Sequence, residues 1–416
     1  MEDEQSPACC FSAADILLPR DTDPAYWAVI ACDQFTSQPE YWQAVRERTQ
    51  GRVSAAHLIL PESELNRDPS ASVERIHRTM LQYLQDGVFQ SYRECYIYTE
   101  RTLLDGSIRC GVVGKVDLEA YDYSGTVNAA IRATEKTVPE RIPPRMAVRR
   151  GAALELPHVL LLCDDDQNLL LEPLHRNREV LPKLYDFDLM LGGGHVAGWL
   201  VSGKEKQSLD ARLLQYAEDQ AEKHPDSSLL FAVGDGNHSL ATAKACYEEQ
   251  KALHSPAGTV SAPTRYALCE LNNIHDPAQK FTPIHRLVKH CNVREFLADL
   301  QNQFPYSRGT AVPWMTEDAS GTVFLPCESD SLPLTILQDF LDRWLSGHPG
   351  ELDYIHGEDV LMRLSRNADS VGFLLPAVEK NSLFSGILAD GVLPRKTFSM
   401  GQAEEKRYYL EARNIQ

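Results

Sequence analysis

The sequence predicts a mixed fold of the α+β class, in which helices and strands follow one another in irregular order. Three observations support this prediction: apolar residues at helical spacing between Ser70 and Asp86, short β-rich runs such as residues 95–98, and the lack of regular strand–helix–strand winding. The chain has 416 residues, and a single core rarely stays unified at this length. We therefore expect two or three lobes and divide the chain into residues 1–260 and 261–416.

The individual elements follow from apolar periodicity and from turn residues. Gly87 stops the helix that begins at Ser70, and Asp105-Gly106 joins two strands as a turn. Residues 133–145 are polar and Pro-rich and show neither period, so they are predicted to form a loop. The predicted strands are 27–32, 95–98, 108–116, 157–163, 229–233, 265–271, 371–376 and 407–410, and the predicted helices are 40–49, 70–86, 210–223 and 239–253.

Charge and composition exclude several classes of partner. The formal net charge is −18, and no basic run is longer than Arg149-Arg150. Nucleic acid and anionic membranes require clustered Lys and Arg, so neither is an expected partner. The sequence has no apolar window of 18 residues and no basic leader, so we predict a cytoplasmic protein. The ten cysteines include no C-x-x-C pair and are predicted to be reduced thiols. The oligomeric state is left open.

The strongest local feature is Gly234–Ser239, which lies between a predicted strand and a predicted helix and reads Gly-Asp-Gly-Asn-His-Ser. Its glycines allow a sharp turn and close backbone approach, and Ser239 is a candidate N-cap. A helix start presents free N–H groups and the positive end of a dipole, which together favour an anion such as phosphate. Asp235 could hold a metal, and His238 could donate to a phosphoryl oxygen or transfer a proton. The competing interpretation is that Asp235 caps a turn and that His238 is a surface histidine.

A second candidate is the polar loop that contains Glu135. A carboxylate in such a loop can act as general base towards a hydroxyl. Lys136, Arg141 and Arg145 could bind phosphate, and Lys136 and Thr137 could contact a substrate. From spacing alone, a solvated charged loop is the favoured interpretation.

Further candidates lie elsewhere in the chain. Arg286 offers a planar fork for phosphate, with His285 beside it, and Lys396 belongs to a compact cationic loop. Ordinary surface ion pairs or solubility would also account for these residues. Asp33 follows the predicted strand 27–32 and is expected to contact substrate.

Several segments in order resemble those of domain-of-unknown-function family 1015 (DUF1015). Residues 233–243 resemble its D-G-H-H-R-Y-x-x-A signature, and residues 131–137 resemble its H-E-K-T segment. Residues 282–286 and 393–397 are similar to its P-T-H-R segment and to its M-P-P-K-S-T ending. The resemblance covers nearly the whole chain from Trp27 onward, and four ordered matches are far more specific than any one of them.

This family is similar to proteins of the ParB/sulfiredoxin fold, among which the free-serine kinases carry a D-G-H-H-R motif and an essential Glu. The resemblance therefore implies a kinase, that is, a transferase of serine metabolism that moves phosphate between ATP or ADP and free serine with Mg²⁺. It also leaves open a phosphoserine phosphatase and a nucleotide-binding regulatory protein without turnover. The acidic composition argues against the chromosome-partitioning role of ParB relatives.

The resemblance assigns roles residue by residue, with departures. Catalysis falls to Glu135, Asp235 and His238, and Asp235 would hold the metal. Phosphate or nucleotide binding falls to Gly236, Asn237, Ser239, Arg145, Arg286 and Lys396, and substrate contacts to Asp33, Lys136, Thr137 and His285. The family's first His is Asn237 here, and its Arg is Ser239, so the motif has lost a phosphate-binding cation.

Overall fold

The structure, a computed structural model, describes residues 9–36, 38–65, 69–125, 128–253, 262–326, 333–377, 379–394 and 396–416. The chain forms two compact units, and the first of them is discontinuous. Unit 1 comprises Met1–Gln279 together with Gln402–Gln416, and unit 2 comprises Lys280–Gly401. The boundary predicted between residues 260 and 261 lies outside the described residues.

Unit 1 is built on an 11-stranded mixed sheet, counted over the described residues. Its main path runs β10 (Lys183–Asp188), β11 (His195–Val201), β4 (Phe89–Thr102), β5 (Ile108–Asp117), β13 (Tyr266–Asn273), β9 (Leu160–Cys163), β12 (Phe231–Asp235), β7 (Ile131–Ala133) and β6 (Tyr121–Asp122). Off this path, β1 (Phe11–Ser12) pairs with β5, and β2 (Ala14–Pro19) pairs with β4. The pairs β13–β9, β12–β7 and β6–β7 are parallel. This mixture of strands and helices agrees with the predicted mixed fold.

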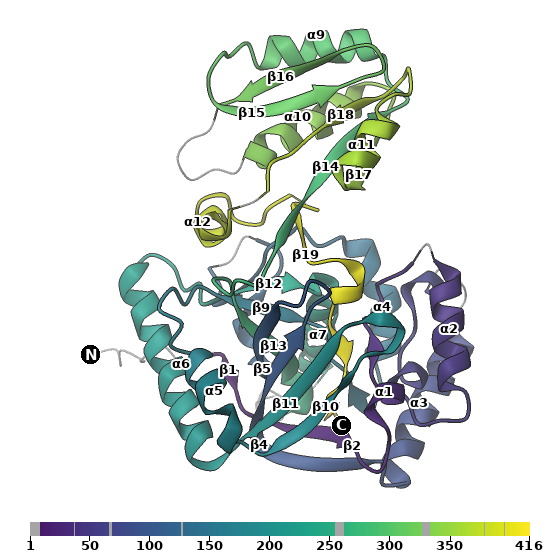
Figure 1. The fold of residues 1–416 in the computed structure, drawn as a ribbon, viewed down its shortest axis with the longest axis vertical. Helices are drawn as coiled ribbons and strands as arrows, with labels where there is room; N and C mark the ends of the chain where they lie inside the picture. The colour runs from purple at the N-terminus through teal and green to yellow at the C-terminus, as the bar shows by residue number, and fades with distance from the viewer. Residues whose placement is uncertain are drawn as a thin grey trace. The chain divides into compact units, whose positions relative to one another are not determined.

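The helices of unit 1 lie around this sheet (Figure 1). They are α1 (Pro24–Trp27), α2 (Pro39–Thr49), α3 (Ser70–Gln85), α4 (Ile142–Arg149), α5 (Glu172–Asn177), α6 (Gly203–Lys223) and α7 (Asn237–Leu253), counted over the described residues. One face of α3 buries Ile76 and Met80, as its apolar spacing predicted, together with Tyr83, whereas Leu81 is exposed. Two 3₁₀ turns, Glu62–Glu64 and Pro139–Arg141, also contribute to the site below.

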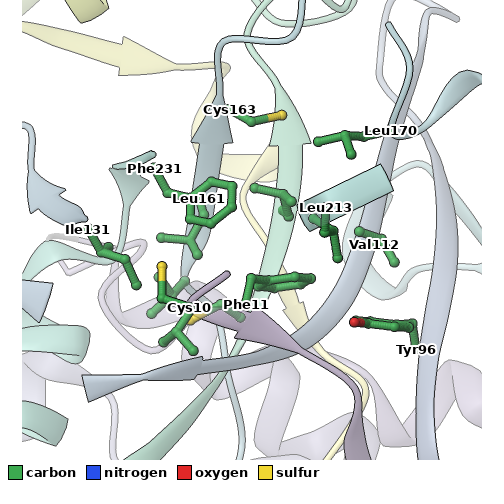
Figure 2. Close-up of a cluster of buried hydrophobic side chains, with 14 of the residues drawn as sticks. Cys10, Phe11, Tyr96, Val112, Ile131, Leu161, Cys163, Leu170, Leu213 and Phe231 are labelled. Carbon is green, nitrogen blue, oxygen red and sulfur yellow. The ribbon is translucent and has the colours of Figure 1, made fainter. Parts of the chain in front are cut away.

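The larger core of unit 1 lies between the sheet and helices α6 and α7. Figure 2 shows Phe231, Leu161 and Phe11 in this cluster, with Leu213 of α6 packed against them. The ring of Phe231 stacks on Tyr216 of α6, with 5.7 Å between ring centroids. A second cluster gathers Trp27 with residues of α2 and α3. Burial on both sides explains why the central strands are nearly continuous apolar runs.

Residues 402–416 supply two short strands to unit 1. β20 (Tyr408–Tyr409) pairs with β3 (Val29–Ile30), and β21 (Arg413–Asn414) pairs with β8 (Leu154–Glu155). The indole N–H of Trp27 donates to the carbonyl of Leu410 at 2.7 Å. This segment therefore closes the core that begins near Trp27.

Unit 2 contains a six-stranded sheet in its described residues. The strands are β14 (Phe281–Lys289), β15 (Thr310–Met315), β16 (Ser320–Leu325), β17 (Glu351–His356), β18 (Val371–Phe373) and β19 (Phe398–Met400), and the helices are α9 (Val293–Gln303), α10 (Pro333–Gly347), α11 (Glu358–Leu364) and α12 (Lys380–Asp390). Phe296 of α9 packs with Phe340 and Trp344 of α10 in its core.

Three predicted boundaries are corrected. Trp27 ends a short helix capped by the Asp23 side chain, so the predicted strand 27–32 is reduced to Val29–Ile30. The predicted loop 133–145 contains the start of α4, because its prolines occupy the first turn, where no N–H is needed. Helix α7 begins at Asn237 rather than Ser239.

Candidate functional site

The turn between β12 and α7 forms the centre of the candidate site. Gly236 has a φ of +82°, and a Cβ there would lie 3.1 Å from the Cα of Val159, so the turn favours glycine. Its carbonyl accepts from the N–H groups of Ser239 and Leu240, which makes Gly236 the N-cap of α7. Ser239 is therefore the third helical residue and not the cap. Because the N–H groups of Ser239 and Leu240 donate within the turn, those of Asn237 and His238 are the ones suited to an anion.

Parallel pairing brings the Glu135 loop beside this turn. In the β7–β12 register Ala133 is opposite Val233, so the chain leaves the sheet at the same edge in both segments. Glu135 and Asp235 each lie two residues beyond this pair. The Thr134 hydroxyl donates to the carbonyl of Val233 at 2.7 Å and anchors the start of the loop. Two candidates that are distant in sequence are thus placed at one sheet edge.

Asp235 is held by a lysine that the sequence analysis did not select. Its Oδ2 lies 3.2 Å from Nζ of Lys406, and its Oδ1 accepts from the N–H of Gly236 at 3.0 Å. The Lys406 side chain is only 9% exposed, and residues 402–416 bring it to the site. The motif thus has a nearby cation although Ser239 stands at the family's Arg position.

Asp33 belongs to the same group of charges. Burial by itself would raise the pKa of its carboxyl, but the charges of His158 and Lys406 and a hydrogen bond from Gln34 outweigh burial and lower this pKa. The Gln34 Nε2 donates to Asp33 Oδ1 at 3.0 Å. The Nδ1 of His158 lies 2.8 Å from the hydroxyl of Tyr409. Asp33 is therefore ionised at neutral pH.

His238 is a neutral imidazole in this environment. Burial, followed by the charges of Arg145 and Arg141, lowers its pKa to about 4. Its Nε2 accepts from the backbone N–H of Val138 at 3.2 Å. The proton of the neutral ring then resides on Nδ1, where it can be donated to an acceptor such as a phosphoryl oxygen.

Arg145 lies in this neighbourhood but is already paired. Its Nη2 lies 2.7 Å from Glu62 Oε2, and Nη1 donates to the carbonyl of Arg141 at 2.7 Å. Arg141 lies 3.8 Å from the other oxygen of Glu62. The two guanidinium groups and one carboxylate leave a net positive charge beside His238.

Two orphaned polar atoms border the helix start. The Oδ1 of Asn237 and the Oγ1 of Thr137 are buried, and neither has a hydrogen-bond partner among the described residues. The amide nitrogen of Asn237 reaches the Thr134 hydroxyl only at 3.5 Å. Buried groups are normally paired, so both atoms are suited to contact a bound molecule. Lys136, in the same loop, is exposed, and Glu135 is half-buried.

The remaining candidates lie in unit 2. Arg286 is fully buried, where its Nε donates to Gln338 Oε1 at 2.8 Å and its guanidinium lies over the Tyr354 ring. His285 is buried too, and its Nδ1 accepts from the N–H of Leu375 at 3.2 Å. Lys396 is exposed. In unit 2 the buried pair holds strand β14 in place, and the phosphate and substrate contacts predicted for these residues stay predictions.

Sequence reasoning missed Lys406, His158 and Glu62. Lys406 stands immediately before the predicted strand 407–410, where a charged residue could be interpreted only as a strand end. His158 follows Pro157 at the start of another predicted strand. No local pattern marks these three residues, because each reaches the site through pairing between distant segments.

Comparison with known proteins adds limited similarities. No curated protein matches the sequence. Among solved structures, a free serine kinase in complex with AMP has 12% identity and a TM-score of 0.37, covering 73% of this chain and 90% of its own. SbnI with a C-terminal truncation from Staphylococcus aureus has 8% identity and a TM-score of 0.37, with coverage of 70% and 82%. A conserved hypothetical protein from Pyrococcus furiosus has 12% identity and a TM-score of 0.34, with coverage of 71% and 90%.

Two further findings concern the whole sequence. No helix among the described residues has both the length and the apolar character needed to cross a membrane. Residues 15–414 match the family described as "Protein of unknown function (DUF1015)". This match covers nearly the entire chain, including every candidate residue named above. The chain therefore belongs to the DUF1015 family.

Proposed function

We propose that this protein transfers a phosphoryl group from ATP or ADP to the hydroxyl of a small amino acid, with free serine as the acceptor. The observation that carries the proposal is the β7–β12 register, which brings the Glu135 loop to the same sheet edge as Asp235 and the start of α7. Phosphoryl transfer depends mainly on positioning and on charge neutralisation, and this edge offers a carboxylate, a cation and an amide-lined helix start.

In this proposal the helix start binds phosphate. The N–H of Asn237 faces a phosphate of the nucleotide, with Gly236 and Ser239 beside it in the turn, and the neutral ring of His238 donates from Nδ1. The orphaned Oδ1 of Asn237 accepts from the substrate. Lys406 supplies the positive charge that the family's Arg would supply.

The proposed chemistry needs one base and one metal. Glu135 takes the proton of the substrate hydroxyl. The hydroxyl oxygen attacks the terminal phosphorus of the nucleotide, and the bond from this phosphorus to the leaving phosphate breaks. ATP gives ADP, or ADP gives AMP, together with the phosphorylated amino acid. Asp235 would hold Mg²⁺, and the ion would supply charge neutralisation to the phosphates, because Mg²⁺ sites commonly combine one or two carboxylates with substrate phosphates.

Substrate recognition is assigned to the remaining residues. Asp33 is ionised and can bind the ammonium group of an amino acid. Lys136 and Thr137 lie in the Glu135 loop, where the Thr137 hydroxyl has no partner among the described residues. Arg145 is proposed to neutralise the transferred group, while the contacts expected of His285, Arg286 and Lys396 stay predictions.

The test is an assay of the purified full-length protein with ATP or ADP, Mg²⁺ and a panel of amino acids, followed by phosphorus NMR. We expect a new phosphoester with serine, formed about 100-fold or more slowly by Glu135→Gln because a general base is lost. Glu140→Gln, an exposed carboxylate in the adjoining turn, serves as the matched control and should behave as the parent.

Three other outcomes would overturn the kinase proposal. Phosphate release from phosphoserine without nucleotide would indicate a phosphatase. Nucleotide binding without turnover would indicate a regulatory protein, and in that case Asp235→Asn would leave the protein's function largely intact. No phosphoester under any combination, with Glu135→Gln indistinguishable from the parent, would remove Glu135 from the chemistry.

A further inference from the structure

A second cluster of reactive side chains lies on strands β4 and β5, outside the site above. Glu100 of β4 is directly opposite Cys110 of β5 in the antiparallel register, so both side chains leave the same face of the sheet. Tyr98 lies two residues before Glu100 on that face. Helix α5 brings His175 over the pair, and its neighbour Leu174 anchors the helix in the large core of unit 1.

The four polar atoms of this cluster converge. The Tyr98 hydroxyl lies 2.9 Å from Glu100 Oε1, 3.2 Å from Cys110 Sγ and 3.1 Å from His175 Nδ1. His175 Nδ1 also lies 2.8 Å from Glu100 Oε1. The ligand atoms of Glu100, Cys110 and His175 all lie within 4.8 Å of one another. They are the one such group of three found in the described part of the chain.

We propose that Glu100, Cys110 and His175 bind a divalent transition-metal ion of the zinc type, with the Tyr98 hydroxyl at the fourth position. Zinc bonds of about 2.0–2.3 Å in tetrahedral geometry place the ligand atoms about 3.3–3.8 Å apart. The separations of 2.8–3.2 Å are slightly shorter than this, and the three ligand atoms all lie within 4.8 Å of one another, so small side-chain adjustments would make room for the ion. The combination of thiolate, imidazole and carboxylate is the donor set of zinc, and it is unsuited to Mg²⁺, which takes oxygen ligands.

The surroundings fit a bound cation that remains accessible. The side chains of His175 and Glu100 are 36% and 12% exposed, so an ion can enter from solvent at the histidine side. Asp276 accepts from the backbone N–H of Cys110 at 2.9 Å and adds negative charge beside the site. Arg178 lies 3.5 Å from Glu100, and its single charge is smaller than the combined charge of Glu100, Asp276 and a metal-bound thiolate.

The ion would add a direct link between elements that packing, hydrogen bonds and the Arg178–Glu100 ion pair already join. Two of its ligands lie on adjacent strands, and the third lies on a helix of six residues, which is too short to be stable on its own. Binding releases the thiol proton of Cys110, and the binding energy stabilises the folded state. The site would thus hold α5 against the β4–β5 pair.

The experiment uses tag-free, full-length protein that has been treated with a chelator and titrated with Co²⁺ and then Zn²⁺. We expect one equivalent of Co²⁺ per chain with a thiolate-to-cobalt charge-transfer band, displaced by Zn²⁺. Cys110→Ser should abolish the band. His175→Ala should weaken Zn²⁺ binding, measured by competition with a chromogenic chelator, by about tenfold or more.

Matched controls separate the cluster from other donors. Arg176→Ala changes an exposed residue of the same helix, and Cys246→Ser removes a buried thiol of α7, and both should keep the parent's spectrum and affinity. Should Cys110→Ser fail to fold, His175→Ala decides the question, since this histidine is partly exposed. A cobalt complex without a thiolate band, a band that persists in Cys110→Ser, or unchanged Zn²⁺ affinity in His175→Ala would overturn the proposal.

Discussion

Nζ of Lys406 lies 3.2 Å from Oδ2 of Asp235, although the two residues come from distant segments of the chain. The charge of this ammonium group also contributes to lowering the pKa of Asp33. One buried cation therefore serves two carboxylates that approach it from different loops.

Lys406→Met should destabilise unit 1. The change leaves Asp235 and Asp33 without their shared cation in a largely buried setting, at a cost of about 1–3 kcal/mol. Urea unfolding at neutral pH measures this loss. Lys204→Met, which removes an exposed lysine of α6, should shift the midpoint little, and equal effects of the two variants would contradict the assigned role.

Asp33→Asn should lower the unfolding free energy at neutral pH and have less effect at low pH. Because the folded pKa of Asp33 is lowered, its contribution is complete above the unfolded value near 4 and is lost as pH falls towards the folded pKa. The difference in unfolding free energy between the parent and Asp33→Asn should therefore shrink below about pH 4. A difference that stays constant down to the acid transition would argue against an ionised Asp33.

His238→Gln should act in a different pH window. The folded pKa of about 4 lies below the ordinary value of 6.5, so the unfolded chain takes up a proton first as pH falls. The parent should lose up to about 2 kcal/mol between these two values, after allowance for partial exposure, and the variant should not show this loss. Urea midpoints at a series of pH values test this.

The pKa of His195 is shifted in the opposite direction to that of His238, so its effect on stability should have the opposite pH dependence. Burial lowers the pKa of His195, but hydrogen bonds to Asp188 and Asp186 outweigh burial and raise it above 6.5. Its contribution is therefore present at low pH and lost as pH rises through the folded value. His195→Gln should reduce stability at pH 6 more than at pH 8, and the reverse order would contradict this assignment.

Much of the fold was predictable where the apolar periodicity agreed with the positions of turn and helix-ending residues. The helix over residues 70–86 is confirmed as Ser70–Gln85, and the paired strands around the Asp105-Gly106 turn are confirmed as β4 and β5. The prediction for residues 133–145 was wrong at its end, because a pair of prolines can begin a helix as readily as interrupt one. Trp27 was assigned to a strand because the apolar run that it begins indicates burial, and burial does not distinguish a short helix from a strand.

The candidate site was predictable only in part. The β12–α7 turn was recognised from its glycines, and the parallel register places the Glu135 loop at the same edge. Lys406 could not be found, because its role depends on residues 402–416 returning to unit 1. Arg286 was expected to serve a ligand, and its hydrogen bonds within unit 2 involve Gln338, a partner that no sequence spacing reveals.

Gly236→Ala should destabilise more than Gly51→Ala. Both glycines have positive φ, but an added Cβ meets Val159 at 3.1 Å in the first case and nothing within 4 Å in the second. We expect about 1 kcal/mol for the backbone strain alone and about 2–3 kcal/mol where the contact is added. The difference between the two urea midpoints measures the cost of the contact with Val159. Equal losses of unfolding free energy would show that the turn can shift to admit the Cβ.

Ser239→Arg should restore a cation to the helix start. If the proposed phosphate site is correct, the variant should bind ADP about threefold to tenfold more tightly in calorimetric titration. Ser239→Gln has a comparable polar side chain without charge and should resemble the parent. Unchanged affinity in Ser239→Arg would place the nucleotide elsewhere.

The return of residues 402–416 to unit 1 has a consequence for synthesis of the protein. The segments that pair with β3 and β8 leave the ribosome after all of unit 2. Until then unit 1 cannot complete its fold, and Trp27 and its neighbours are incompletely covered. Contacts of such long sequence separation form late and slowly. During this interval the nascent chain exposes apolar surface, and unit 2 can fold before unit 1 is complete.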